Sequence, residues 1–594
     1  MDSMKGFMGE ILVVNLSDNT TNTIPIDEKI AKKFLGGSGY ASRILYDLID
    51  GTTDPLGPDN ILMFMTGPLT GTLAPCTGRH VVCGKSPLTG FWGESHSGGH
   101  FGAFLKFSGY DGILIKGKAK TPVTIHVNDK TISILDAQHL WGKTTDVTQK
   151  ILRDELGKVQ TACIGPAGEN LVKFAGIMND ERSAARCGLG AVMGSKFLKA
   201  ISVEGSNRPE LTNDPEFREI ATESFKTLGE VMEILRESGT ATYVDVGMMY
   251  YDMPVKYFQE TEFDVDGLNA SAMKELLVGR SACYSCPIAC GRKISLSEYD
   301  LKEIAGPEYQ TIAAFGSNVM IDDLKKVAYM NHLCNQYGMD TISCGGTLAF
   351  AIHLCDIGKL EWGLTWGDSE SMIDLIHAIA RRQGYGDELA EGSMRLAKKY
   401  NASDIAIHVK GLEVANHDPR AFGGMATIYA VAARGGTHLE GDMYSVDMGV
   451  EVRELGLVAG DPQDDDGKGR TAAIAQDFRA FFDSVIMCHF AIVPTEKILN
   501  LVSKALSIPF GLIDILKIGA RAVTMKRLFN LRCGLQPSDD RLPKAFLKPQ
   551  PDGVTYDYVP DVEKQIKEYY EYRKWDLETG KPTQPVFDKL DLDC

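Results

Sequence analysis

The sequence predicts an α+β protein in which a β-rich first part is followed by a mainly helical remainder. Up to about residue 208, short apolar or alternating runs are bounded by Gly, Pro and Asp, which is typical of strands. Beyond that point the apolar residues recur with the helical period. With 594 residues the chain is too long for a single core, so several domains are expected.

Four short apolar runs predict strands in the first part, at residues 11–15, 61–65, 80–83 and 112–116. Two further runs, at 123–127 and 131–135, flank Asn128-Asp-Lys130 and predict a hairpin with a short polar turn. One helical pattern interrupts the strands, at residues 144–156.

A polar segment at residues 205–214 ends in a helix-start pattern and predicts the first domain boundary. Amphipathic spacing then predicts helices at residues 215–238, 321–337, 346–358, 369–383 and 388–400. A second boundary near 410–418 gives domains of 1–208, 209–412 and 413–594. From Pro549 onward the chain is rich in Pro, Asp and Lys, and we expect this tail to wrap the surface.

Composition excludes several classes of partner. The formal net charge of −17 argues against binding nucleic acid or an anionic membrane, since both need a basic surface. No run of about 18 apolar residues predicts a membrane span, and the amino terminus has no secretion-signal pattern. The 13 cysteines are odd in number and irregular in spacing, which favours a reducing cytoplasm over a disulfide framework.

Three cysteines form a C-x2-C-x3-C array: Cys283, Cys286 and Cys290. A disulfide between two of them leaves the third cysteine unpaired. A zinc site would usually have a second pair of Cys or His ligands, and none follows at the expected distance. An iron–sulfur cluster needs four thiolates, the fourth of which can come from far along the chain. The spacing therefore favours iron–sulfur over zinc, with an incidental grouping as the third interpretation.

Glycine is abundant, at 61 residues, and gathers in four loops at residues 35–40, 97–102, 165–168 and 187–194. Glycine lets the backbone approach a ligand closely and leaves N–H groups free for phosphates. Neither a P-loop nor a dinucleotide fingerprint is present. Each loop alone is typical of a turn, but four of them, with Arg79 and Arg186 beside two, favour an anionic, multi-armed cofactor.

Seven stretches, in order along nearly the whole chain, indicate a family. They are Lys85-Ser-Pro-Leu-Thr-Gly90, Ser97-Gly-Gly-His-Phe-Gly102, Gly165-Pro-Ala-Gly-Glu-Asn170, Gly190-Ala-Val-Met-Gly-Ser-Lys196, Gly306-Pro-Glu-Tyr309, Gly338-Met-Asp-Thr-Ile-Ser343 and Asn530-Leu-Arg532. In these stretches the chain resembles the aldehyde ferredoxin oxidoreductase family of tungsten, sometimes molybdenum, enzymes. The resemblance implies an N-terminal domain of two sheets as the base for a bis-pterin cofactor, covered by two mainly helical domains.

The resemblance also implies a 4Fe–4S cluster beside one pterin. Three of its ligands are the cysteines of the array, and the fourth closes a D-x-x-G-L-C motif. Here that motif reads Asp483-Ser-Val-Ile-Met-Cys488, so Cys488 is the expected fourth ligand, with Ile and Met in place of Gly and Leu. The rival for this position is Cys533.

In the family the aspartate of this motif accepts hydrogen bonds from a pterin, a role that falls here to Asp483. A second copy of the motif ends at Asp340 but has Asn335 in place of its first aspartate. Magnesium bridges the pterin phosphates in the family through backbone carbonyls, here those of His96 and Cys187. The expected cofactor-binding set is Arg79, His96, Ser97, Gly98, Gly99, Arg186, Cys187, Gly188, Asn335, Asp340, Asp483 and Met487.

For catalysis the resemblance implies Glu308 and His438, because the family places a glutamate and a histidine near tungsten. A carboxylate can take a proton from water, and an imidazole can polarise a carbonyl. Many family members have a second glutamate where this chain has Gln310, an amide that cannot act as a base. His417 and His489 are alternative candidates.

The implied reaction is oxidation of a small aldehyde to a carboxylic acid, with ferredoxin or a small ferredoxin-like Fe–S subunit taking the electrons. The assembly would be a homodimer or a hetero-oligomer. A basic stretch is expected either to dock an acidic ferredoxin or to form one solvated helix face; it contains Lys517, Arg521, Lys526, Arg527 and Arg532. The alternatives are a low-potential reductase of aromatic acyl-CoA (benzoyl-CoA) and a non-catalytic Fe–S electron-transfer subunit.

Overall fold

The computed structural model describes residues 4–553 and 555–593. Two six-stranded sheets make up the first part of the chain, which confirms the predicted β-rich start. The first has the order β2-β1-β6-β3-β4-β5 and the second β11-β10-β9-β12-β7-β8. The strands are β1 Glu10–Asn15, β2 Thr20–Pro25, β3 Leu62–Met65, β4 His80–Lys85, β5 Trp92–Ser97, β6 Gly112–Lys116, β7 Val123–Asn128, β8 Thr131–Asp136, β9 Gln160–Cys163, β10 Ile177–Asn179, β11 Arg182–Ala184 and β12 Leu198–Glu204.

Burial follows the position of each strand in its sheet. The central strands β3 and β4 are buried at every residue, because protein covers both of their faces. At the edge, β2 is rich in Thr and Asn and mostly exposed. The predicted hairpin is β7–β8, and its turn residues Asp129 and Lys130 both adopt positive φ, as a two-residue hairpin turn requires.

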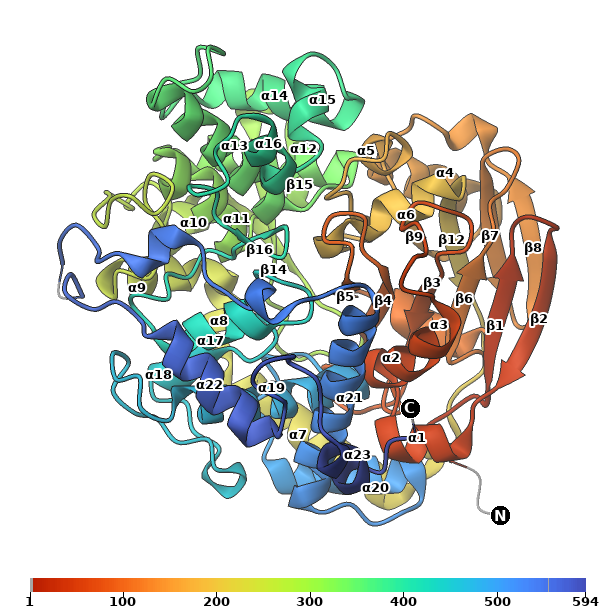
Figure 1. Ribbon diagram of the computed structural model, residues 1–594. Coiled ribbons are helices and arrows are strands. Elements are labelled where there is room, and N and C mark those ends of the chain that lie inside the picture. Colours follow the sequence, from red (N-terminus) through yellow and green to blue (C-terminus); the bar gives the residue numbers. More distant parts are fainter. Residues whose placement is uncertain (1–3, 554, 594) are drawn as a thin grey trace.

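Helices dominate the rest of the chain, as predicted (Figure 1). The longer ones are α7 Pro215–Val231, α12 Leu324–Tyr337, α13 Thr341–Asp356, α14 Ser369–Arg381, α19 Lys468–Val485, α20 Thr495–Leu506, α21 Leu512–Arg532 and α22 Val562–Arg573. The helix predicted at 388–400 is in fact two, α15 Tyr385–Leu389 and α16 Ser393–Lys399. They are separated at Gly392, whose φ of 84° no α-helix contains. Similarly, the helix predicted at 215–238 breaks at Met232, where α8 Glu233–Ser238 begins.

The tail from residue 549 was expected to wrap the surface, but part of it is buried in the helical part of the molecule. Helix α22 packs against α19, and Tyr569, Tyr570 and Trp575 are buried there. Arg573 Nη1 also lies 2.8 Å from Asp477 Oδ1 of α19, and both side chains are at most 4 % exposed. Aromatic residues at helical spacing decide this packing, although the overall composition of the tail is polar.

The basic stretch on α21 is not a docking surface. Arg521, Lys526 and Arg527 are each at most 7 % exposed. Lys526 pairs with Glu94 at 2.6 Å and Arg527 pairs with Asp540 at 2.6 Å. Arg521 donates to the backbone carbonyls of Leu590 and Lys33. Because these three cations are buried, both predictions for them, a docking surface and a solvated helix face, are wrong.

Helix α21 joins the two parts of the molecule beside β5 and α2 Gly37–Leu48 (Figure 1). Its Asn530 side-chain oxygen accepts a hydrogen bond from Trp92 N of β5 at 2.7 Å. None of the described helices combines the length and the apolar character needed to cross a bilayer. The domain limits near residues 208 and 412 stay predictions.

Candidate active site

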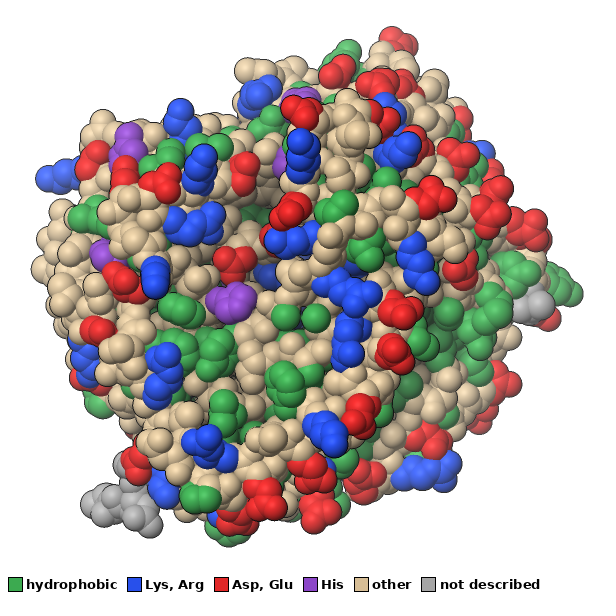
Figure 2. Space-filling model, turned by 180° about the vertical axis from the view of Figure 1, so that it is seen from behind, with side chains coloured by type: hydrophobic (Ala, Val, Ile, Leu, Met, Phe, Trp, Pro, Cys, Tyr) green, Lys and Arg blue, Asp and Glu red, His purple; other side chains and the backbone are tan. Residues whose placement is uncertain are grey.

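A cavity of about 620 Å³ is lined both by the β-rich first part and by the helical remainder. That volume is within the range of cofactor and ligand sites. The face of the molecule in Figure 2 is hollowed near its centre, with acidic and basic side chains interspersed around the hollow. Most of the residues that the sequence singles out line the cavity.

Cys283, Cys286, Cys290 and Cys488 all line this cavity. The first three lie on the loop between β13 Leu277–Ser281 and β14 Gly291–Leu296, and Cys488 follows the end of α19. The structure therefore brings together cysteines some two hundred residues apart. Cys533, at the end of α21, is absent from the described lining of the cavity.

Cys76, a fifth cysteine, connects these two segments. Its backbone N–H donates to Ser285 O at 2.8 Å, and its carbonyl accepts from Cys488 N at 2.9 Å. Its sulfur lies 3.6 Å from Cys286 Sγ. This contact lowers the pKa of the Cys286 thiol to about 6, although burial opposes the shift. No sequence pattern indicates Cys76, because it has no regular spacing to the other cysteines.

The surroundings of the cysteines fit an anionic cluster. A Cβ added at Gly98 would lie only 2.7 Å from Cys283 Sγ, so glycine lets the backbone pass close to that sulfur. Arg182 also faces these cysteines, and its Nη2 is buried without a hydrogen-bond partner among the described residues. Burial opposes the charge of Arg182, but Cys283, Cys290 and Glu308 raise its pKa above the ordinary value. Four thiols beside a cation with an unused donor suit an iron–sulfur cluster.

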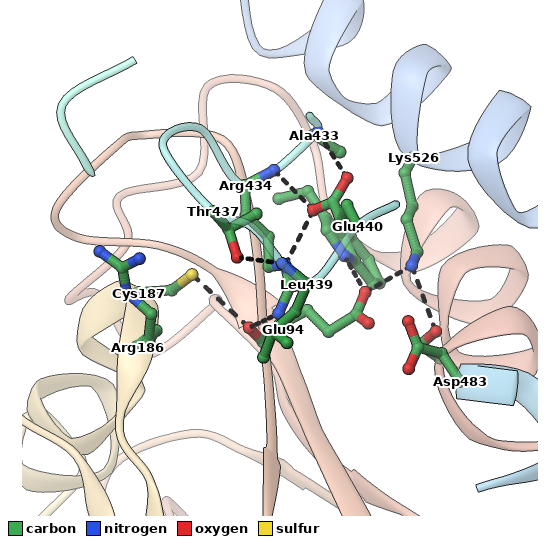
Figure 3. A network of polar contacts seen from close by, with 12 residues as sticks. Glu94, Arg186, Cys187, Ala433, Arg434, Thr437, Leu439, Glu440, Asp483 and Lys526 are labelled. Carbon is green, nitrogen blue, oxygen red and sulfur yellow. Dashed lines mark hydrogen bonds and ion pairs between the residues drawn. The ribbon is translucent and has the colours of Figure 1, made fainter. Parts of the chain in front are cut away.

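Acidic and imidazole groups alternate along one wall of the cavity. Asp483 Oδ1 lies 3.2 Å from His489 Nε2 and 3.5 Å from His96 Nε2, and His96 Nε2 is 2.8 Å from Glu94 Oε1. Figure 3 shows the Lys526 ammonium beside the carboxylates of Glu94 and Asp483. The family resemblance involves only the carbonyl of His96, so this side-chain network was not predicted.

The carboxylates of Glu94 and Asp483 are both ionised, although of the two only Asp483 is in the described lining of the cavity. Burial opposes the charge of Glu94, but Lys526 and His96 hold its pKa well below the usual range. Burial likewise opposes the charge of Asp483, while His96 and His489 hold its pKa well below the ordinary value. Asp483 can therefore accept hydrogen bonds from a ligand in the cavity.

Arg186 is held mainly by protein acceptors. Its Nε lies 3.1 Å from Asp340 Oδ2, and its two Nη atoms donate to Gly436 O and Glu413 O. Two of its five N–H groups are left for a ligand. Asp340 also caps α13 by accepting from Ile342 N at 3.0 Å. Each of the two residues thus helps to hold the other in the cavity wall.

The other expected cofactor residues divide into two groups. Arg79, Gly98 and Asn335 line the cavity, as do His96, Arg186, Asp340 and Asp483. Outside its described lining are Ser97, Gly99, Cys187, Gly188 and Met487. Ser97 Oγ donates to Asn179 Oδ1 at 2.5 Å, and the Cys187 carbonyl accepts from Ser86 Oγ at 2.8 Å. Met487 is only 2 % exposed and packs in the apolar core, so its backbone alone is left to contact a pterin.

Glu308 lies at the cavity wall as the residue before α11 Tyr309–Phe315. Its Oε1 is 3.1 Å from Arg292 Nη2 and 3.4 Å from Arg182 Nη1, and its Oε2 accepts from Thr240. Burial opposes its charge, but the two arginines and Thr240 bring the pKa of Glu308 below the ordinary value. Glu308 is therefore a carboxylate at neutral pH.

His438 presents an unused ring nitrogen. The residue is 8 % exposed, and its Nδ1 has no hydrogen-bond partner within the described part of the chain. Burial first, and then the charges of His417 and Arg186, hold the pKa of His438 well below the ordinary value. A neutral imidazole with a buried nitrogen free for a ligand is thus available in the cavity.

Next to His438, aromatic side chains form a wall that we define as Tyr243, Tyr309, His417 and Tyr444. The His417 and Tyr444 rings stack with centroids 4.3 Å apart, and His417 lies 5.2 Å from His438. No sequence pattern connects these four positions, which come from four separate segments. The aromatic wall was therefore not predicted, except that His417 was an alternative catalytic candidate.

The polar atoms of the wall are tied to the protein. Asp252 Oδ2 lies 2.6 Å from His417 Nδ1 and accepts from Tyr243 OH at 3.0 Å. Tyr309 OH donates to Asn416 O at 2.8 Å. Gln310, which replaces a family glutamate, accepts from Asn416 N at 2.8 Å and so fixes the segment that bears His417. These contacts leave the ring faces of the wall and the second ring nitrogen of His417 for the cavity.

Comparison with known proteins covers almost the whole chain. A family model described as "Aldehyde ferredoxin oxidoreductase, N-terminal domain" matches residues 11–205, and another described as "Aldehyde ferredoxin oxidoreductase, domains 2 & 3" matches residues 216–592. The "Tungsten-containing aldehyde ferredoxin oxidoreductase" of Pyrococcus furiosus is 41 % identical over 99 % of each chain. The protein with that name from Pyrococcus horikoshii is 39 % identical over 99 % of this chain and 100 % of its own.

One solved structure is also similar, the "Active site complex BamBC of Benzoyl Coenzyme A reductase in complex with 1,5 Dienoyl-CoA". It superposes with a TM-score of 0.84 at 25 % sequence identity, and covers 99 % of this chain and 97 % of that one.

Proposed function

Because this chain belongs to the aldehyde ferredoxin oxidoreductase family, we propose that it oxidises aldehydes to carboxylic acids at a tungsten bis-pterin centre in the cavity. Electrons leave through a 4Fe–4S cluster to ferredoxin or a small ferredoxin-like Fe–S subunit. The observation on which this depends is one cavity lined by four cysteines, by Glu308 and by His438. We place the protein in the cytoplasm, as a homodimer or a hetero-oligomer.

The chain offers a residue set for each part of the cofactor. Cys283, Cys286, Cys290 and Cys488 would hold the cluster. Around the pterins would lie Arg79, Arg186, Asn335, Asp340 and Asp483. The carbonyl of His96 would bind magnesium; the Cys187 carbonyl lies outside the described lining and accepts from Ser86 Oγ, so only its second lone pair is left for the ion. When bound, the tungsten (or molybdenum) centre supplies the two-electron redox chemistry, and the cluster conducts single electrons.

Two groups of this chain act on the substrate in our proposal. The neutral His438 donates a hydrogen bond to the aldehyde oxygen and polarises the carbonyl. The ionised Glu308 accepts a hydrogen bond from the water that is consumed and orients it. Aldehyde and water yield a carboxylic acid, two protons and two electrons, and in this proposal Glu308 accepts one of these protons. Its lowered pKa makes it a weak base, so orientation is its main contribution.

The aromatic wall favours a planar aromatic aldehyde. Rings interact with one another through offset stacks or edge contacts, worth roughly 0.5–1.5 kcal/mol beyond their buried area. The wall lies beside His438, where the aldehyde group would sit. We therefore expect benzaldehyde to be a better substrate than cyclohexanecarbaldehyde, which has a ring of the same size without π electrons.

A second candidate is low-potential reduction of an aromatic acyl-CoA. The likeness to the benzoyl coenzyme A reductase complex and the aromatic wall both favour a ring-shaped substrate. A subunit that carries only a cluster is the third alternative. It would not need a cavity that extends from the cysteines to His438.

The test starts with metal analysis of anaerobically purified protein, for which we expect about four irons and about one tungsten or molybdenum per chain. Aldehyde oxidation is then measured with a viologen dye and compared with reduction of benzoyl-CoA by a low-potential donor. Aldehyde turnover supports the proposal. Turnover of benzoyl-CoA alone would move the chain to the second candidate, and iron without tungsten or molybdenum would favour the electron-transfer subunit. A protein that contains only zinc would contradict all three.

A further inference from the structure

Cys76 is the described cysteine that touches the array without having a place in the four-ligand set. Its sulfur lies 3.6 Å from Cys286 Sγ, and the residue is 2 % exposed. A disulfide would need about 2.05 Å between the sulfurs, so the two are separate thiols. The cavity thus has five cysteines where a 4Fe–4S cluster uses four.

Backbone hydrogen bonds fix the position of Cys76. Ser285, between the first two cysteines of the array, accepts its N–H, and Cys488 donates to its carbonyl. Its φ of 61° lies in the left-handed region, which residues other than glycine rarely adopt. The same loop is anchored by Thr77 Oγ1, which hydrogen-bonds Leu69 O and Ala74 O. The thiol is therefore held against Cys286 by the fold.

We propose that Cys76 is not a cluster ligand but donates an S–H hydrogen bond to the ligating sulfur of Cys286 and thereby raises the reduction potential of the cluster. This inference depends on the proposed function, because it requires a cluster on Cys286. Hydrogen bonds to the sulfurs are one of the factors that set the potential of iron–sulfur clusters. A donor stabilises the reduced cluster more than the oxidised one, because reduction adds negative charge to the sulfurs.

The fold determines which of the two sulfurs the cluster uses. Cys286 belongs to the C-x2-C-x3-C array, together with Cys283 and Cys290. Cys76 lies on a different loop, where its sulfur contacts that of Cys286. It is more deeply buried than the three cysteines of the array. As the neighbour of a ligand, it acts on the cluster through the sulfur of Cys286, the cysteine whose sulfur it contacts.

The experiment compares Cys76→Ala and Cys76→Ser in the anaerobically purified holoenzyme. Cys163→Ala is the matched control, because Cys163 is also fully buried and donates a hydrogen bond, to Thr145 O at 3.6 Å, but does not line the described cavity. Iron content and thermal unfolding show whether each variant is loaded and folded. The midpoint potential of the cluster is then measured by EPR-monitored redox titration.

We expect Cys76→Ala to keep its iron and to have a more negative midpoint. At the wild-type midpoint its reduced-to-oxidised ratio should fall by up to about tenfold, ~59 mV for a one-electron couple. Cys76→Ser retains a donor and should recover part of the shift, and the Cys163→Ala midpoint should equal that of the wild type.

Two results would overturn the inference. One is an unchanged midpoint in both Cys76 variants. The other is loss of iron in both Cys76 variants while Cys286→Ala keeps its cluster, which would make Cys76 the ligand. If instead the wild type itself lacks a cluster, the proposed function fails first, so the two failures are distinguishable.

Discussion

Glu308 Oε1 lies 3.1 Å from Arg292 Nη2, so the carboxylate proposed to act on the substrate is paired with a cation at the cavity wall. Replacing Glu308 with Gln keeps its size but removes the negative charge. We expect kcat for aldehyde oxidation to fall by about 10²-fold, because the water loses the carboxylate that orients it and that takes its proton. Iron and tungsten contents should stay at wild-type values. Activity within about twofold of the wild type would remove Glu308 from the mechanism.

The Arg292 pair also predicts a pH dependence. The pKa of Glu308 lies below its ordinary value because Arg292 and Arg182 outweigh the effect of burial. Activity needs the ionised carboxylate, so it is lost as the pH falls through this pKa. Arg292→Met should raise the pKa and move the acid limb of the kcat/KM profile to higher pH. Arg292→Lys, which keeps the charge, should leave that limb near the wild-type position, and coincident limbs in Arg292→Met and the wild type would contradict this prediction.

For the neutral His438, replacement by Phe should lower kcat by about 10²-fold or more, because the substrate oxygen loses its donor. The cluster spectrum should not change, since His438 is not one of the proposed ligands. Steady-state kinetics with a viologen acceptor and EPR of the reduced protein provide the two readouts. Equal loss of activity and cluster signal would point to a structural role instead.

The aromatic wall predicts substrate selectivity. Tyr444→Leu removes the ring that stacks on His417 at 4.3 Å. We expect kcat/KM for benzaldehyde to fall by roughly 2–13-fold, corresponding to about 0.5–1.5 kcal/mol of aromatic interaction. The value for cyclohexanecarbaldehyde should change less. If kcat/KM falls by the same factor for both aldehydes, the Tyr444 ring contributes to the shape of the site and makes no specific aromatic contact with the substrate.

A buried ion pair far from the cavity predicts a stability effect. Arg573→Met leaves Asp477 without its partner between α22 and α19, which should lower the free energy of unfolding by about 3–5 kcal/mol. The control is Arg453→Met, because Arg453 is 74 % exposed beside Glu451 and should contribute at most about 1 kcal/mol. Denaturant unfolding measures both. If Arg573→Met lowers the free energy of unfolding by less than about 1 kcal/mol, the ion pair gains no more than the burial of the two charges costs, which would contradict this prediction.

Local patterns explain what could be predicted from the sequence. Neighbouring residues determine the hairpin turn at Asp129 and Lys130 and the C-x2-C-x3-C array. Both features could therefore be predicted without a structure. The helix predicted at 388–400 was wrong because a single glycine, Gly392, interrupts an otherwise helical pattern. The two sheets followed from strand signals and from the family resemblance together.

Contacts between distant segments explain what could not be predicted. From the sequence, Lys526 is expected to be an exposed basic residue. In the fold its Nζ lies 2.6 Å from the carboxylate of Glu94, which is more than four hundred residues away. Cys76 belongs to no sequence motif, so its role could be inferred only from its contact with Cys286 in the structure. The aromatic wall likewise arises where separate segments converge on His438.

In the proposed site, Cys488 completes a cluster with the three cysteines of the array. The most direct measurement is the iron content of anaerobically purified Cys488→Ala beside Cys533→Ala. We predict that Cys533→Ala keeps about four irons per chain, as in the wild type, and that Cys488→Ala loses at least one of them together with the wild-type EPR signal. Full iron and an unchanged signal in Cys488→Ala, with loss in Cys533→Ala, would contradict the claim.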